Sequence, residues 1–283
     1  MGATPFRAFA FSPFRLNRRR PSASILAIQS AACSGATSLA SFFGNLRERF
    51  RGPPPAAKAE HFVVIPDLKI AFGRVPKAAN SSIKAALARH VSHDPDGPVK
   101  PTRDQFWAEC TNGRTSMMTP AEAARLAGYL IFTFTRNPFD RLVSCYNNKI
   151  VVSKELPASF ARLGFDKDMS FDAFAAKVAT IDDGHADIHF QSQAAMLAHD
   201  GDIVPGFIGR FENLADDWHD LDAALAAHCG IRLGRLEKRN YRRGGADDLA
   251  GYYRSNETVA LVRQRYADDF RLFYPDAGAP GGA

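Results

Sequence analysis

Residues 129–150 read YLIFTFTRNPFDRLVSCYNNKI, and they predict a buried strand that leads directly into a helix. Its first seven residues, up to Thr135, are almost all apolar, β-branched or aromatic, which is typical of a buried strand. A helix follows, because Asn137 is a favourable N-cap and Pro138 stands at the first helical position. One apolar stripe of this helix must face the core. Its members are Phe139, Leu142, Val143, Tyr146 and Ile150.

Three polar side chains accompany this strand and helix. Arg136 stands at the mouth of the strand, where ligands bind in open α/β sheets. Arg141 and Ser144 lie off the apolar stripe, about 60° apart around the helix. The pattern predicts that these polar groups converge at the carboxyl end of the strand. The alternatives are a surface salt bridge for Arg136 and a solvated position for Ser144.

A second strand–loop–helix unit precedes this one, in residues 69–91, KIAFGRVPKAANSSIKAALARHV. We expect a strand from Lys69 to Val75 and then a helix with Ser81 or Ser82 as its N-cap. The loop between them leads into a helix N-terminus, whose free N–H groups and dipole favour anions. Lys77 adds a charge there. The loop is not a Walker A sequence, because its lysine comes early and no glycine follows Gly73. The alternative is a capped helix with an exposed lysine.

The charge of the chain is unevenly distributed. Residues 1–60 carry nine Arg or Lys against two Glu, while the remainder holds 27 basic and 28 acidic residues. The net charge of +6 therefore belongs to an extension, and we expect no nucleic-acid partner for the folded part. With 283 residues, of which 46% are apolar, the chain can bury a large core. We predict a low-complexity extension over residues 1–60 and one domain over residues 61–283.

The basic extension allows three interpretations. Residues 24–44 are only mildly apolar, which makes a membrane-spanning helix marginal and a targeting signal weak. The arginines of the extension favour peripheral contact with anionic lipid. A disordered or wrongly started extension is the third interpretation. The four cysteines are widely spaced, which indicates reduced thiols in a cytoplasmic setting rather than a disulfide scaffold or zinc ribbon.

The two units together resemble the nucleotide-binding elements of the sulfotransferase superfamily, most closely the carbohydrate sulfotransferases that act on chondroitin and dermatan. Residues 136–146, RNPFDRLVSCY, fit a pattern of the type R-[DN]-P-[FY]-x-R-x-x-S-x-[YF] at every defined position. Residues 76–82, PKAANSS, fit P-K-x-x-x-[ST]-[ST]. Residues 187–193, DIHFQSQ, are similar to D-x-H-[WF]-x-P-Q, with Ser192 where proline is usual. Two further segments resemble the family: residues 209–214, and Tyr252-Tyr253 with the amphipathic helix Val259–Phe270 that follows them.

The resemblance implies a P-loop-like α/β fold, a mostly parallel sheet flanked by helices. It implies sulfuryl transfer from 3′-phosphoadenosine 5′-phosphosulfate to a hydroxyl, of a carbohydrate or another acceptor, without a metal. The first loop would hold the 5′-phosphosulfate, with Lys77 also stabilising the leaving oxygen. Arg136 and Ser144 would hold the 3′-phosphate. The donor-binding residues implied are Pro76, Lys77, Ala78, Ala79, Asn80, Ser81, Ser82, Arg136 and Ser144. Asn240, Arg242 and Arg243 mark a basic loop or further phosphate contacts.

The reaction also needs a base that takes the proton of the acceptor. His189 is our first choice and His185 the second, with Asp187 as an orienting group or a rival base and Glu212 as a further carboxylate. The spacing of the two histidines is known from helical zinc sites, but Ala186 stands where H-E-x-x-H needs glutamate. The alternatives to a sulfotransferase are a nucleotide-dependent kinase and a non-catalytic relative that binds nucleotide or glycan.

Overall fold

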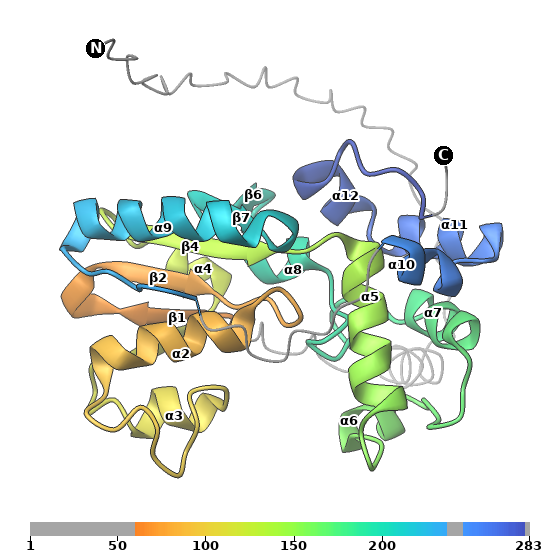
Figure 1. The fold of residues 1–283 in the computed structure, drawn as a ribbon, viewed down its shortest axis with the longest axis horizontal. Coiled ribbons are helices and arrows are strands. Elements are labelled where there is room, and N and C mark those ends of the chain that lie inside the picture. The colour runs from red at the N-terminus through yellow and green to blue at the C-terminus, as the bar shows by residue number, and fades with distance from the viewer. Residues whose placement is uncertain (1–59, 237–245, 281–283) are drawn as a thin grey trace, which may run out of the picture. The chain divides into compact units, whose positions relative to one another are not determined.

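A five-stranded sheet forms the centre of the protein in this computed structural model, which describes residues 60–236 and 246–280 (Figure 1). The strand order is β3-β1-β2-β4-β7. The strands are β1 (Phe62–Ile65), β2 (Ile70–Gly73), β3 (Ser116–Met118), β4 (Leu130–Thr135) and β7 (Phe207–Arg210). Two further short strands, β5 (Ala198–His199) and β6 (Asp202–Ile203), form a separate antiparallel pair.

The strands that carry the predicted loops are parallel. β2 pairs with β4, placing Gly73 opposite Thr133, and β4 pairs with β7, placing Thr135 opposite Arg210. β1 is antiparallel to both β2 and β3. The mostly parallel α/β sheet expected from the sequence is confirmed. Because parallel strands end at the same edge, the loops that follow β2, β4 and β7 meet there.

Helices cover both faces of the sheet. α2 (Asn80–Val91) and α9 (Leu214–Cys229) pack on the face that carries Phe72 and Phe132, whose rings stack 5.3 Å apart (Figure 1). α4 (Pro120–Ala123) and α8 (Gln193–Leu197) pack on the opposite face. The other helices are α3 (Asp104–Glu109), α5 (Pro138–Tyr146), α6 (Ala158–Arg162), α7 (Phe171–Ala179), α10 (Ala246–Tyr252), α11 (Asn256–Arg265) and α12 (Ala267–Phe273). Short turns complete the fold: η1 (Pro66–Leu68), η2 (Asn147–Val151) and η3 (Phe211–Asn213).

Residues 129–150 fold as predicted. β4 ends at Thr135, and the side chain of Asn137 caps α5 by accepting from the backbone N–H of Phe139 at 3.0 Å. Pro138 occupies the first turn. Four members of the apolar stripe are buried, and Tyr146 is half-buried. α5 then continues into η2, a π-helical turn.

Two local predictions are wrong. α2 begins at Asn80 after Ala79, which takes the N-cap position in a left-handed conformation, so Ser81 and Ser82 lie inside the helix rather than before it. The amphipathic stretch Val259–Phe270 is two helices, α11 and α12, because the backbone leaves the helical conformation at Tyr266. The predicted strand leading to a helix at residues 209–214 is confirmed as β7, η3 and the start of α9.

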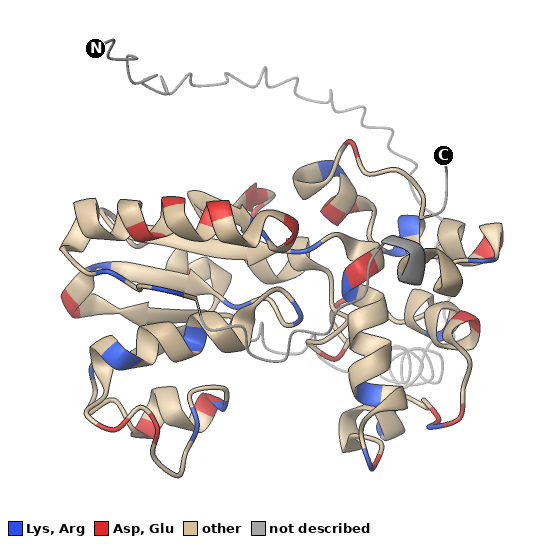
Figure 2. Cartoon of the chain, viewed as in Figure 1, with Lys and Arg blue, Asp and Glu red and all other residues tan. Residues whose placement is uncertain are grey.

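Among the described residues, no helix has the length and apolar character needed to span a bilayer. The interpretations of residues 1–59, and those of Asn240, Arg242 and Arg243, fall outside the described residues. Charges are mixed over the described part, and acidic side chains follow one another along α9 (Figure 2).

Candidate active site

The loop after β2 has an unusual backbone. Lys77 and Ala79 both adopt left-handed conformations, with φ of 73° and 56°, although neither is glycine. Such conformations are costly for residues with a Cβ atom and persist only when the surroundings impose them. Two arginines from the β4–α5 unit hold the backbone of this loop at Pro76 and Lys77. Arg136 Nη1 donates to the carbonyl of Lys77 at 3.2 Å, and Arg141 Nε donates to that of Pro76 at 3.0 Å.

Arg141 has a structural role that could not be predicted from the sequence. Its side chain is only 2% exposed, so it does not join the ligand-facing polar groups as predicted. It also donates to the carbonyls of Gln191 at 2.7 Å and Ile188 at 3.2 Å. One buried guanidinium therefore ties the loop after β2 to the turn that carries His189. A fork of five donors suits this task, and a helical-wheel argument cannot detect it.

Arg136 lies at the carboxyl end of β4, as predicted. Its guanidinium carbon is 4.3 Å from the centre of the Phe211 ring, and its Nη2 atom is 3.8 Å from Asp140. Its buried Nε atom has no hydrogen-bond partner among the described residues. Burial lowers the pKa of Arg136, opposed by Asp140 and Glu212. The side chain thus has capacity left for an anion.

A buried amide fixes the backbone of Arg136. Gln193 accepts from the N–H of Arg136 at 2.9 Å and donates to its carbonyl at 2.8 Å. Asp269, also fully buried, accepts from the Gln193 side chain at 3.2 Å and from the N–H groups of Gln193 and Ala194 at 3.0 and 2.7 Å. Ser192 stands where the family pattern quoted above has proline. It caps α8 by accepting a hydrogen bond from the N–H of Ala195 at 3.2 Å. The sequence patterns included both Gln193 and the C-terminal stretch that contains Asp269, but gave no sign of the contact between them.

Ser144 lies on α5 two turns beyond Arg136, is half-buried, and forms no side-chain hydrogen bond with any described residue. Ser81 is half-buried and Ser82 buried in the first turn of α2, next to the loop. Ala78 is buried and Asn80 half-buried in the same segment. The loop residues and Arg136 are therefore together at one edge of the sheet.

His189 and Asp187 form a polar pair on the turn that Arg141 ties to the loop. His189 Nδ1 lies 2.6 Å from Asp187 Oδ1, and the His189 N–H donates to the same oxygen at 2.9 Å. Burial opposes ionisation of Asp187, but hydrogen bonds from His189 and Ser159 outweigh it and lower its pKa to about 2. Burial lowers the pKa of His189, and Asp187 opposes that shift. The segment is a turn rather than a strand, which is why the two side chains meet.

The other proton acceptors named from the sequence lie elsewhere or are engaged. His185 is exposed and pairs with Asp182, its Nδ1 atom 2.9 Å from Oδ1. Glu212 accepts from the N–H of Asn137 at 2.7 Å and from the hydroxyl of Tyr274 at 2.9 Å. Of the two histidines named from the sequence as bases, His189 is thus the one on the turn that Arg141 ties to the loop.

The loop and the His189 turn are close enough for their charges to interact. Burial is the main cause that lowers the pKa of Lys77 to about 8; Cys145 opposes the shift, and the nearby charges of Lys149, Arg136 and Arg141 add to it. Lys77 and Lys149 also lower the pKa of His189. Lys149, on the π-helical turn η2, was missed from the sequence because an unbroken α-helix was expected there. This edge of the sheet concentrates positive charge.

The site is suited to a polyanionic ligand. A helix N-terminus, lysine and arginine side chains gather where three parallel strands end, beside a histidine with one ring nitrogen left for proton transfer. Within the described residues, no group of three or more His, Cys, Asp or Glu side chains could hold a metal ion.

One of the comparisons with known proteins identifies a family. A family model described as the sulfotransferase family matches residues 60–275, which is more than half of the chain. The matched range contains every site residue described above. The search of curated proteins and the search of solved structures each returned no match.

Proposed function

Because the chain belongs to the sulfotransferase family, we propose that it transfers a sulfuryl group from 3′-phosphoadenosine 5′-phosphosulfate to a hydroxyl of a carbohydrate. The observation that carries the proposal is the hydrogen bond from Arg136 to the carbonyl of Lys77. It joins the two segments that would grip the two ends of this nucleotide.

The donor carries anionic groups at both ends. Lys77 and the N–H groups at the start of α2 face the 5′-phosphosulfate. Arg136 and Ser144 bind the 3′-phosphate, which distinguishes this nucleotide from ATP, through charge-assisted hydrogen bonds. The unpartnered Nε atom of Arg136 and the open Ser144 hydroxyl support this assignment.

The transfer is an in-line displacement in which position and electrostatics do most of the work. The bond between sulfur and the acceptor oxygen forms as the bond between sulfur and the bridging phosphate oxygen breaks. The leaving phosphate keeps that electron pair, and the Lys77 ammonium stabilises the charge. The acceptor proton passes to Nε2 of His189, since Nδ1 is engaged with Asp187.

A comparison of nucleotides tests this proposal against the kinase alternative. The desulfated product, 3′-phosphoadenosine 5′-phosphate, should raise the melting temperature, and ATP should not. Stabilisation by ATP with magnesium in place of the 3′-phosphorylated nucleotide would overturn the proposal. Binding of the product without any transfer to a panel of glycans, lipids and small alcohols would instead favour the non-catalytic relative.

The basic extension supports a second proposal, about location. Residues 1–60 hold the whole surplus of positive charge, and each arginine or lysine near an anionic bilayer contributes about 1 kcal/mol. We infer a cytoplasmic protein with peripheral membrane contact through this segment. The full chain should sediment with phosphatidylserine vesicles at low salt and a chain lacking residues 1–59 should not. Equal sedimentation of both chains contradicts the inference.

A further inference from the structure

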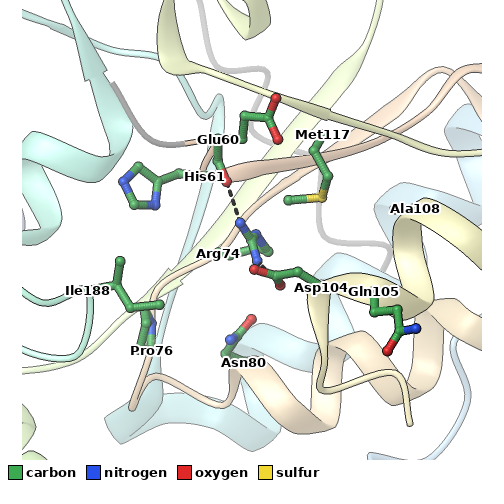
Figure 3. A pocket seen from close by; sticks show the side chains of 10 residues that line it. All are labelled: Glu60, His61, Arg74, Pro76, Asn80, Asp104, Gln105, Ala108, Met117 and Ile188. Carbon is green, nitrogen blue, oxygen red and sulfur yellow. Dashed lines mark hydrogen bonds and ion pairs between the residues drawn. The ribbon is translucent and has the colours of Figure 1, made fainter. Parts of the chain in front are cut away.

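A cavity of about 390 Å³ lies beside the loop after β2 (Figure 3). Pro76 and Ile188 both line it, so the cavity adjoins the residues that precede Lys77 and His189 in the sequence. Arg74 and Asn80 line it from the two ends of the loop, and Ala108 lines it from α3. Its volume is within the range of about 300–1,000 Å³ that is usual for ligand sites. The proposed transfer needs an acceptor at this place.

Two buried polar atoms on this wall lack a partner. The Nε atom of Arg74 and the Oδ1 atom of Asn80 form no hydrogen bond with any described residue. The other nitrogens of Arg74 are engaged, Nη1 with Asp104 and Nη2 with the carbonyl of Glu60. Figure 3 shows the Asn80 amide below the Arg74–Asp104 pair and directed toward it. Both atoms are buried in the cavity wall with almost no accessible surface, and buried groups of this kind call for a partner.

A hydroxyl is the group that matches both atoms. It donates to an acceptor such as Asn80 Oδ1 and accepts from a donor such as Arg74 Nε. A carboxylate or a sulfate only accepts, so it would leave the Asn80 oxygen without a partner. The complementarity therefore favours a hydroxyl-bearing ligand over an anionic one.

The charges around the cavity also favour an uncharged ligand. Asp104 neutralises Arg74 and also pairs with Lys84, which is 1% exposed and lies 3.2 Å away. Glu60 supplies a second negative charge beside Arg74, so the two carboxylates balance the two cations Arg74 and Lys84. Burial lowers the pKa of His61, a further wall residue, to about 4, so its imidazole is neutral at neutral pH. The cavity wall is balanced in charge, in contrast to the cationic donor site.

We propose that this cavity binds an uncharged, hydroxyl-bearing ring of the acceptor, a neutral sugar residue rather than a uronic acid or a sulfated sugar. The proposal rests on the proposed sulfuryl transfer and specifies its acceptor. The apolar side chains of Met117 and Ile188 supply a surface for the C–H face of the ring, and the loop brings the donor to its hydroxyls.

Matched acceptors test the charge preference. Nitrophenyl glucoside and glucuronide differ only in a hydroxymethyl group against a carboxylate, and so do the galactoside and galacturonide. With labelled donor, kcat/KM for the neutral member of a pair should exceed that for the acid by at least tenfold. Gln105→Lys, which adds a cation to the cavity wall, should narrow this ratio. Preference for the uronides by the unaltered protein overturns the proposal.

A second variant tests the location. Ala108→Phe should fill part of the cavity and raise KM for the acceptor at least tenfold. Ala227→Phe, at an exposed alanine of α9 outside the cavity, should leave KM unchanged. Affinity for 3′-phosphoadenosine 5′-phosphate should be the same in both variants and in the unaltered protein. If Ala108→Phe transfers the sulfuryl group with an unchanged KM for the acceptor, the cavity assignment is overturned and the proposed function stands. If the unaltered protein does not bind 3′-phosphoadenosine 5′-phosphate, both are overturned.

Discussion

His189 Nδ1 lies 2.6 Å from Asp187 Oδ1, and the same carboxylate oxygen accepts the backbone N–H of His189. A carboxylate facing Nδ1 selects the tautomer that carries its proton there. Nε2 then keeps a lone pair, and the ring cannot turn over without losing the Asp187 hydrogen bond. The geometry suits a base.

His189→Ala should therefore lower kcat by roughly 10²–10⁴-fold, the range expected for loss of acid–base assistance. Single-turnover measurements with saturating donor give the comparison, and affinity for the spent nucleotide should change little. The control is His185→Ala, because His185 is exposed and pairs with Asp182 instead. An inactive His185 variant beside an active His189 variant would reverse the assignment. If both stay active, a carboxylate is the base, and Asp187 is the next to test.

The pH dependence of kcat/KM for the donor should be bell-shaped. Burial lowers the pKa of His189, so the base becomes neutral below its ordinary value of 6.5 and the rate rises with pH there. Burial lowers the pKa of Lys77 to about 8, so the rate falls as pH rises through that value and the ammonium is lost. Lys77→Arg should remove the alkaline limb, because arginine stays charged. An alkaline limb that persists in Lys77→Arg belongs to another group.

Lys77 should matter more for turnover than for binding. Its ammonium faces charge that develops on the leaving oxygen, so Lys77→Ala should lower kcat about 10²–10³-fold, as the loss of an oxyanion donor does. Calorimetry with the desulfated nucleotide should show a smaller loss of affinity. A variant with near-normal kcat would show that the lysine is only a surface charge.

Arg136 and Ser144 should recognise the 3′-phosphate. Arg136→Ala should weaken donor binding by about 2–4 kcal/mol, and Ser144→Ala by about 1 kcal/mol. Both losses should be larger for the 3′-phosphorylated nucleotide than for its 3′-dephosphorylated analogue. Calorimetry with the two nucleotides checks this, and equal losses for both would refute the assignment.

The sequence was informative where local chemistry determines structure. The strand up to Thr135, the Asn137 cap and the apolar stripe of α5 follow from neighbouring residues, and all are present. The start of α2 did not follow, because the loop before it has a left-handed backbone at Lys77 and Ala79, and its carbonyls at Pro76 and Lys77 bind arginines that come about 60 residues later. Propensity rules contain no such distant contact.

Long-range partners were also beyond the sequence. Arg141 was expected near the ligand because it lies off the apolar stripe, yet three backbone carbonyls from two other segments bury it. The cavity beside Pro76 needs the residues before β1, helix α3 and the His189 turn to come together. Spacing along one element reveals which residues share a face, but not what packs against that face.

Gln193 should act as a positioning residue for Arg136. It is fully buried, and its side chain holds both backbone polar groups of Arg136 while Asp269 orients its amide. Gln193→Leu keeps much of the volume but removes these bonds, so the guanidinium should lose its fixed position. We expect the 3′-phosphorylated nucleotide to lose about 1–2 kcal/mol of binding free energy, the value of one or two hydrogen bonds, and the 3′-dephosphorylated analogue to lose less.

Ser192→Ala is the matched control for this last prediction. It removes the N-cap of the same helix, α8, but Ser192 does not touch Arg136. It should cost about 1 kcal/mol of unfolding free energy and leave the ratio of the two nucleotide affinities unchanged. Thermal melts report the first effect, and calorimetry with both nucleotides reports the second. If both variants lower the melting temperature and neither changes the affinity ratio, Gln193 stabilises α8 alone, and Arg136 is positioned by its contacts with Phe211 and the Lys77 carbonyl.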